Sequence, residues 1–217
     1  RRTAMQLYYT PIRGYVHTVE ALVAYAGLRE RLVPVPTKPY APDTPLPAVN
    51  PLGKVPTLVL DDGSYLAGGP VIYEYLDSLH DREPLYPAPP ARWQALRRAW
   101  LADGLFDQLV LLIVEGWVAK PAQRPDYARR CWDKVVRALD RLELDAATPG
   151  PLDIGHVRTV GALAFLDLKG AQIAADLESA LPEAQGVAWR DGRTRLAEWY
   201  ARERERAIYA TPLLPDP

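Results

Sequence analysis

The residues from Asn50 to Pro56 have the composition of a loop that presents its main chain to a ligand. Pro56 stands between a Gly-Lys pair and the apolar run Thr57 to Leu60. Because proline cannot donate a hydrogen bond to a sheet, it marks either the first residue of a strand or a cis peptide bond. A cis bond would turn the N–H and C=O groups of Val55 outward. The chemistry expected of this loop is main-chain pairing with an extended peptide.

The sequence indicates no other kind of reactive site. The histidines His17, His80 and His156 share no metal-ligand spacing, and no Gly-rich phosphate loop or Ser-His-Asp pattern stands out. The single cysteine, Cys131, excludes an internal disulfide and is expected to be a small packed residue in a helix. A net charge of -1 offers no basic surface to nucleic acid, and no apolar run approaches the roughly 18 residues of a membrane span. We therefore expect a soluble, cytoplasmic protein without a metal, nucleic acid or membrane partner.

The elements that position the loop belong to a first domain predicted over residues 5–83. Apolar spacing and turn residues indicate a strand over Met5–Tyr9, a helix over Tyr15–Leu28, a strand over Arg31–Val35, two strands around the turn Asp61-Asp62-Gly63, and a helix beginning at Pro70. Pro34 favours an edge position for the second strand. The stretch from Pro36 to Pro51 is predicted to be a loop. The order β-α-β-loop-β-β-α is typical of an α/β domain.

The second part of the chain carries helical patterns only. Residues 84–90 are proline-rich and predict a stiff linker between domains. The helical segments that follow are Ala91–Val118, Tyr127–Leu144, Ile154–Leu168 and Arg193–Ile208. They predict an all-α bundle as a second domain over residues 91–217. Asp103 and Asp107, one turn apart in the first of these helices, could line the cleft between the domains, but a position on the helix surface is the main expectation.

The chain resembles the cytosolic glutathione transferases, and in particular their bacterial members. The residues that carry the resemblance are Asn50-Pro51-Leu52-Gly53-Lys54-Val55-Pro56, Gly68–Leu79 and Leu152-Asp153-Ile154-Gly155. The resemblance implies a thioredoxin-like first domain, an all-helical second domain and a homodimer. It also implies an enzyme that uses glutathione as co-substrate and activates its thiol for attack on a small apolar electrophile, by conjugation, dehalogenation or isomerisation. Asp153 would cap a helix, which is worth about 1 kcal/mol.

In this family a hydroxyl between the first strand and the first helix stabilises the glutathione thiolate. Lowering a thiol pKa by about 2 units takes roughly 2.7 kcal/mol, most of which one charge-assisted hydrogen bond supplies. Cysteine is absent from this stretch, which disfavours the branches of the family that form mixed disulfides. Tyr9 resembles the donor of the tyrosine-type classes, while a second alignment nominates Thr10 or Tyr15. Both alignments stay open.

The resemblance also implies the remaining glutathione contacts. Val55 would pair with the cysteinyl backbone beside Pro56, and Lys54 would reach the glycyl carboxylate. The γ-glutamyl group would lie at the start of the third helix. The expected glutathione-binding residues are Arg13, Lys54, Val55, Pro56, Gly68 and Gly69.

One departure from the family lies at the start of that third helix. Family members usually have an acidic or amide residue followed by serine, which hold the γ-glutamyl group, whereas this chain has Gly68-Gly69 before Pro70. If each lost contact costs about 1–2 kcal/mol, glutathione affinity falls by about 30- to 1000-fold. The glycine amides, or basic residues such as Arg13 or Lys38, would have to compensate. The departure leaves two alternatives: a non-catalytic ligand-binding protein of this fold, or a specialised pathway enzyme that no longer uses glutathione.

Overall fold

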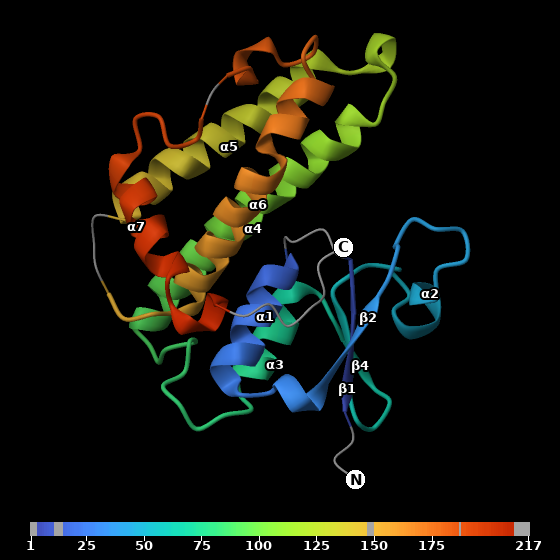
Figure 1. Ribbon diagram of the computed structural model, residues 1–217, viewed down its shortest axis with the longest axis vertical. Coiled ribbons are helices and arrows are strands. Elements are labelled where there is room, and N and C mark those ends of the chain that lie inside the picture. Colours follow the sequence, from blue (N-terminus) through green and yellow to red (C-terminus); the bar gives the residue numbers. More distant parts are fainter. Residues whose placement is uncertain (1–3, 11–14, 147–149, 187, 211–217) are drawn as a thin grey trace. The chain divides into compact units, whose positions relative to one another are not determined.

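The computed structural model describes residues 4–10, 15–146, 150–186 and 188–210, which belong to two compact units (Figure 1). The first unit comprises Arg1–Tyr86 together with Glu205–Pro217, and the second comprises Pro87–Arg204. The division falls inside the proline-rich segment predicted as a linker. The last segment of the chain groups with the first unit, not with the helices that precede it.

A four-stranded mixed sheet forms the centre of the first unit. Its strands, in the order β2-β1-β3-β4, are β2 (Leu32–Pro36), β1 (Met5–Tyr9), β3 (Thr57–Val59) and β4 (Tyr65–Ala67). β1 pairs in parallel with β2, and the other two pairings are antiparallel. The predicted edge position of the strand that contains Pro34 is therefore confirmed.

Helices cover both faces of this sheet. α1 (Tyr15–Ala26) and α3 (Gly69–Asp77) pack together on one face, and the short α2 (Leu46–Val49) lies on the other (Figure 1). α2 was expected to be loop, because four residues among prolines show no helical periodicity. The core between the sheet and the helices is fully buried and includes Leu7, Val19, Leu22, Leu58, Ile72 and Leu76.

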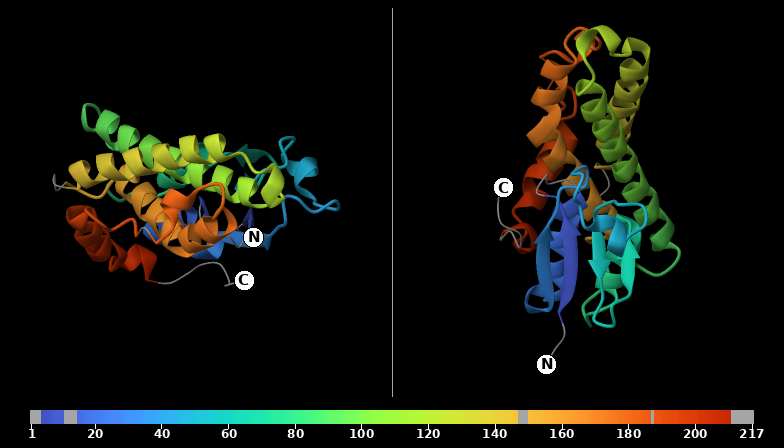
Figure 2. Two further views of the ribbon diagram at one scale, coloured as in Figure 1. Left: turned by 90° about the horizontal axis from the view of Figure 1, so that it is seen from above. Right: turned by 90° about the vertical axis from the view of Figure 1, so that its right-hand side faces the viewer.

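The second unit is a bundle of α-helices, in which α4 packs against both α5 and α6 (Figure 2). Its helices are α4 (Ala91–Gly116), α5 (Pro125–Asp145), α6 (Ile154–Asp176) and α7 (Thr194–Arg204). Short 3₁₀ turns lie at Arg29–Arg31, Lys120–Ala122, Pro182–Ala184 and Ala207–Tyr209, the last of which (η4) belongs to the first unit. The predicted combination of an α/β unit and an all-α unit is confirmed. None of the described helices is long and apolar enough to cross a membrane.

Two acidic residues of the second unit have structural roles. Asp153 caps α6 by accepting a hydrogen bond from the His156 N–H at 3.1 Å, which confirms its predicted role. The surface position expected for Asp103 is wrong, because its carboxylate is buried in an ion pair with Arg158 of α6. A buried carboxylate needs such a partner.

Candidate functional site

The sheet register places the end of β1, the start of β3 and the end of β4 side by side at one end of the sheet. Tyr8 of β1 pairs with Thr57 of β3, which in turn pairs with Ala67 of β4. One residue beyond this pairing, the Gly68 N–H donates a hydrogen bond of 3.4 Å to the Pro56 C=O. Val55 and Gly69 adjoin these two residues in the sequence. Residues from three separate stretches of sequence thus meet beside the first turn of α3.

Val55, just before β3, has backbone N–H and C=O groups without hydrogen-bond partners among the described residues. The bond between Val55 and Pro56 is cis, as Pro56 indicated. Because buried and half-buried backbone groups are nearly always paired, the N–H and C=O groups of Val55 are available to an extended ligand.

Asn50 holds this loop in place, a role that sequence reasoning did not assign. Its side-chain amide donates to the Lys54 C=O and to the Thr57 Oγ1, both at 3.0 Å. Its Oδ1 accepts from the Leu52 N–H at 3.0 Å, and the Thr57 hydroxyl also donates to the Lys54 C=O at 2.8 Å. The side-chain-to-backbone turn at Asn50-Pro51 is a recognised Asx signal, and it could have identified this residue.

The three candidate hydroxyls are placed differently. Tyr9 is 1% exposed, and its phenolic oxygen is buried without a partner in the described part of the chain. Burial raises the pKa of this phenol, and the carboxylate of Glu20 on α1 raises it further. Thr10 is half-buried just after β1. Tyr15 begins α1, and its side chain lies outside the described residues.

The structure places two of the three basic residues predicted to help bind glutathione. Lys54 and Lys38 are both exposed, and Lys54 directly precedes Val55. Arg13 lies outside the described residues, so its predicted glutathione contact is not placed. Of the basic candidates, Lys54 is therefore the one that the structure places next to the unpaired peptide groups of Val55.

The first turn of α3 offers backbone donors. Gly68 precedes the helix with a φ of 89°, a conformation that favours glycine. The N–H groups of Gly69 and Val71 have no acceptor within the described ranges, and Pro70 has no N–H to offer. A helix N-terminus with free N–H groups favours an anionic ligand.

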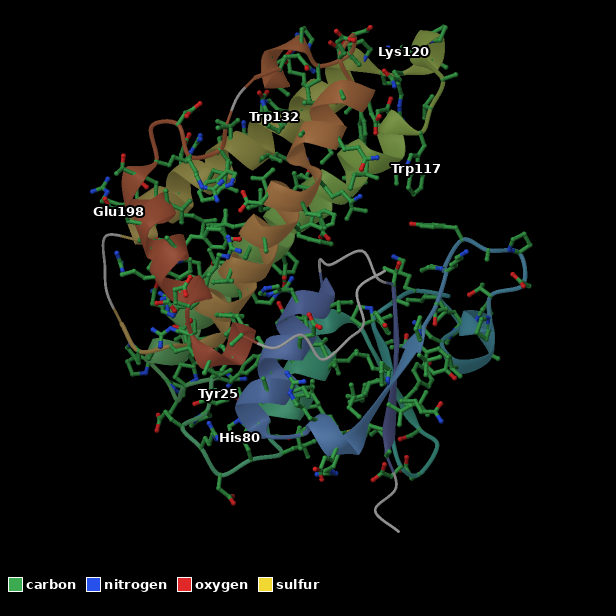
Figure 3. The ribbon with its side chains drawn as sticks, viewed as in Figure 1. Tyr25, His80, Trp117, Lys120, Trp132 and Glu198 are labelled. Carbon is green, nitrogen blue, oxygen red and sulfur yellow. The ribbon has the colours of Figure 1, made fainter. Side chains whose placement is uncertain are left out.

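The histidines serve the fold. His80 bonds Asp77 at 3.1 Å, and its ring lies edge-on to that of Tyr25 with ring centroids 5.2 Å apart. Figure 3 labels His80 and Tyr25, which lie close together in the first unit. Asp77 in turn accepts from the backbone of Leu85 and Tyr86, so this cluster fixes the end of the first unit. Across the described residues, no group of three or more His, Cys, Asp or Glu side chains could hold a metal ion. Cys131 is buried in α5, as predicted.

A hollow in the second unit lies next to His156 and Trp199. The charged side chains that line it are already paired. Arg98 bonds Asp153, and Asp145 bonds Arg97 at 3.0 Å. We assign no reaction to this hollow.

Comparison with known proteins identifies the family. The model for the glutathione S-transferase N-terminal domain matches residues 13–79. The uncharacterised GST-like protein YibF of Escherichia coli K12 is 35% identical over 108 residues, 48% of this chain and 52% of that protein. The match thus spans about half the length of this curated relative.

Solved structures extend the similarity to nearly the whole chain. A glutathione transferase family member from Pseudomonas fluorescens Pf-5, with bound glutathione, is 32% identical with a TM-score of 0.80, covering 95% of this chain and 97% of that one. This chain belongs to the glutathione transferase family. A glutathione S-transferase from Methylobacillus flagellatus KT with glutathione bound is 26% identical, with a TM-score of 0.81 and the same coverage.

In this family member, Pro56 and Gly68, two of the residues predicted to bind glutathione, are joined by a hydrogen bond. Val55, Lys54 and Gly69 lie next to them in the sequence. The phenol of Tyr73, one turn further along α3, lies against Gly69, a contact that was not predicted from the sequence. Its signal was present, because a large residue four positions after Gly69 on one helix face contacts that position.

Proposed function

We propose that the chain is an enzyme that activates the thiol of glutathione for attack on a small apolar electrophile, by conjugation, dehalogenation or isomerisation. The main support is the unpaired peptide group of Val55 in a loop held by Asn50. A related glutathione transferase family member, 97% of which this chain covers, carries glutathione in its crystal structure. A peptide that lies extended along Val55 would pair with its N–H and C=O as an added strand does.

The charged ends of glutathione meet matching groups on either side of Val55. Lys54 is exposed and would attract the glycyl carboxylate. The free N–H groups at the first turn of α3 would receive the γ-glutamyl carboxylate. Both contacts are charge-assisted. The hydrogen bonds from the backbone N–H groups are worth about 1.5–3 kcal/mol, whereas the contact with the exposed Lys54 is worth about 0–1 kcal/mol.

Tyr9 is the proposed donor to the thiolate. Its raised phenol pKa keeps the hydroxyl protonated and able to donate at neutral pH. A buried hydroxyl without a partner costs about 1–3 kcal/mol, which a thiolate acceptor would offset. Thr10 and Tyr15 remain the alternatives.

Three single substitutions separate these donors: Tyr9→Phe, with Thr10→Val and Tyr15→Phe as matched comparisons. Loss of a hydrogen bond to the thiolate should lower the rate of glutathione conjugation to an activated aryl chloride by about 10- to 100-fold. We expect this loss for Tyr9→Phe, with glutathione affinity and stability retained. A full rate in Tyr9→Phe, with a loss in either comparison, transfers the role to that residue.

A second candidate is a non-catalytic ligand-binding protein, favoured by the 1% exposure of Tyr9 and by the Gly68-Gly69 start of α3. Calorimetric titration with glutathione and with an apolar dye separates the two. Micromolar glutathione binding with turnover supports the enzyme. Dye binding without glutathione binding supports the second candidate, and turnover with a different thiol supports a specialised pathway enzyme.

We further propose that the protein is a cytoplasmic homodimer. The support for the dimer is family membership, and a sequence with a single cysteine suits a reducing compartment. Light scattering on the purified protein should give twice the chain mass of 24.2 kDa. A mass of one chain at micromolar concentration contradicts the dimer.

A further inference from the structure

Tyr73 occupies the space in which a side chain of residue 69 would lie. A Cβ atom added to Gly69 would stand 2.5 Å from the Tyr73 Oη, 2.7 Å from its Cζ and 2.9 Å from its Cε2. The geometry follows from the helix, because side chains lean towards the N-terminus and cover the residue four positions earlier. Tyr73 is 1% exposed, so the phenol has little room to move aside.

This contact explains why residue 69 is glycine. Gly69 does not have the positive φ that requires glycine, unlike Gly68 next to it. Backbone conformation therefore permits a side chain at 69, and the Tyr73 phenol excludes it. The helix has room for a hydroxyl-bearing side chain at position 69 or for a tyrosine at position 73, but not for both.

The phenol brings a hydroxyl to the same place. Its oxygen lies within 2.5 Å of the added Cβ, which is near where a serine hydroxyl of residue 69 would stand. The N–H groups of Gly69 and Val71 at this turn are without acceptors among the described residues. A phenol can donate one hydrogen bond and accept two, so Tyr73 can serve a ligand in addition to its present contacts.

We propose that Tyr73 provides the side-chain hydroxyl that recognises the γ-glutamyl carboxylate of glutathione, in place of a hydroxyl on residue 69. The assignment rests on the proposed function, since it concerns the same glutathione site. The carboxylate would receive two backbone N–H groups from the first turn of α3 and one O–H from Tyr73. Tyr73 is thereby a specificity residue for γ-glutamyl peptides.

Calorimetric titration of the full chain tests the assignment with two probes, glutathione and the analogue that lacks the γ-glutamyl α-carboxylate. Wild type should bind glutathione at least about 10-fold more tightly than the analogue. Tyr73→Phe keeps the ring and removes the hydroxyl, so it should weaken glutathione binding by about 10-fold and leave analogue binding unchanged. A purely structural role for Tyr73 would not change the preference for the carboxylate.

A rescue variant completes the test. Gly69→Ser alone should lower the melting temperature by about 3–10 °C because its Cβ meets the phenol. Gly69→Ser combined with Tyr73→Leu should relieve this clash and restore glutathione affinity to within about 3-fold of wild type. Equal glutathione affinity in Tyr73→Phe and wild type overturns the assignment alone. Absence of glutathione binding by wild type overturns the proposed function and the assignment with it.

Discussion

Asn50 is the side chain on which the geometry of the Val55 loop depends. Its amide and carbonyl make three hydrogen bonds within the loop and to β3, and Asn50 is 2% exposed. Val55 contributes main-chain atoms, so no substitution at that position removes its contact with a ligand. Asn50 is therefore the residue through which this contact can be tested by mutation.

We predict that Asn50→Ala weakens glutathione binding by at least about 10-fold. The Lys54 C=O and the Thr57 hydroxyl each lose a buried donor, which also costs about 1–3 kcal/mol of unfolding free energy. Urea unfolding and calorimetric titration measure the two effects. The control is Asp62→Ala in the exposed turn after β3, where the lost bonds to Ser64 should change neither quantity. Unchanged glutathione affinity in Asn50→Ala would remove the loop from the site.

At this scale the sequence indicated the peptide bond before Pro56 better than it indicated side-chain contacts. The position of Pro56 between a Gly-Lys pair and an apolar run was enough to suggest the cis bond found there. The Tyr73–Gly69 contact depends on two residues considered as a pair, and the ion pair of Asp103 depends on Arg158, 55 residues away. The spacing of residues within one helix cannot indicate a partner so far away in the sequence.

At the scale of the elements, two hydrogen bonds and an ion pair stabilise the start of α6. The Asp153 carboxylate accepts from the His156 N–H, the His156 ring accepts from the Asp153 N–H at 3.2 Å, and Arg98 pairs with the same carboxylate. Burial alone would raise the pKa of Asp153. The hydrogen bonds of His156, together with the charge of Arg98, outweigh burial and hold this pKa below its ordinary value.

We predict that Asp153→Asn lowers the unfolding free energy by about 1–3 kcal/mol at pH 7. Because the folded-state pKa is lowered, the contribution of Asp153 is complete above its ordinary pKa of 3.8 and is lost as the pH falls through the lower folded-state value. The difference between wild type and variant should therefore shrink below about pH 4. Chemical unfolding at pH 7, 5 and 3 measures it, with Asp133→Asn on the exposed face of α5 as control. A difference that grows towards low pH contradicts this cap.

Element boundaries were predictable where apolar residues repeat over several turns or where glycine and proline mark a turn. β1 begins and ends at the predicted residues. α6 continues to Asp176, beyond the predicted Leu168, because its last two turns carry small and polar residues without a clear apolar face. α2 escaped prediction because a single turn among prolines has no period to detect.

At the scale of the whole molecule, η4 (Ala207–Tyr209) belongs to the first unit although it follows the helices of the second. η4 packs against α1, and the ring of Tyr209 stacks on His17 with centroids 5.3 Å apart. The sequence alone assigned this segment to the helical domain, because its arginine-rich pattern continues that of α7. A contact between the two ends of a chain is not visible in local periodicity.

We predict that Tyr209→Ala lowers the unfolding free energy by about 1–3 kcal/mol through loss of this stacking and of apolar contact. Hydrogen exchange should show the loss at amides of α1, with α5 amides unchanged. Tyr40→Ala serves as control, since Tyr40 is 78% exposed. Equal protection of α1 in wild type and Tyr209→Ala would mean that the end of the chain does not stabilise the first unit.

The proposed function depends on glutathione lying along Val55. A crystal structure of the protein soaked with glutathione tests this most directly. We predict two hydrogen bonds of about 2.9 Å between the cysteinyl unit of glutathione and the N–H and C=O of Val55, with the sulfur directed at the β1–α1 turn. Glutathione bound elsewhere, or a Val55 peptide group still unpaired at saturating glutathione, would contradict the proposed function.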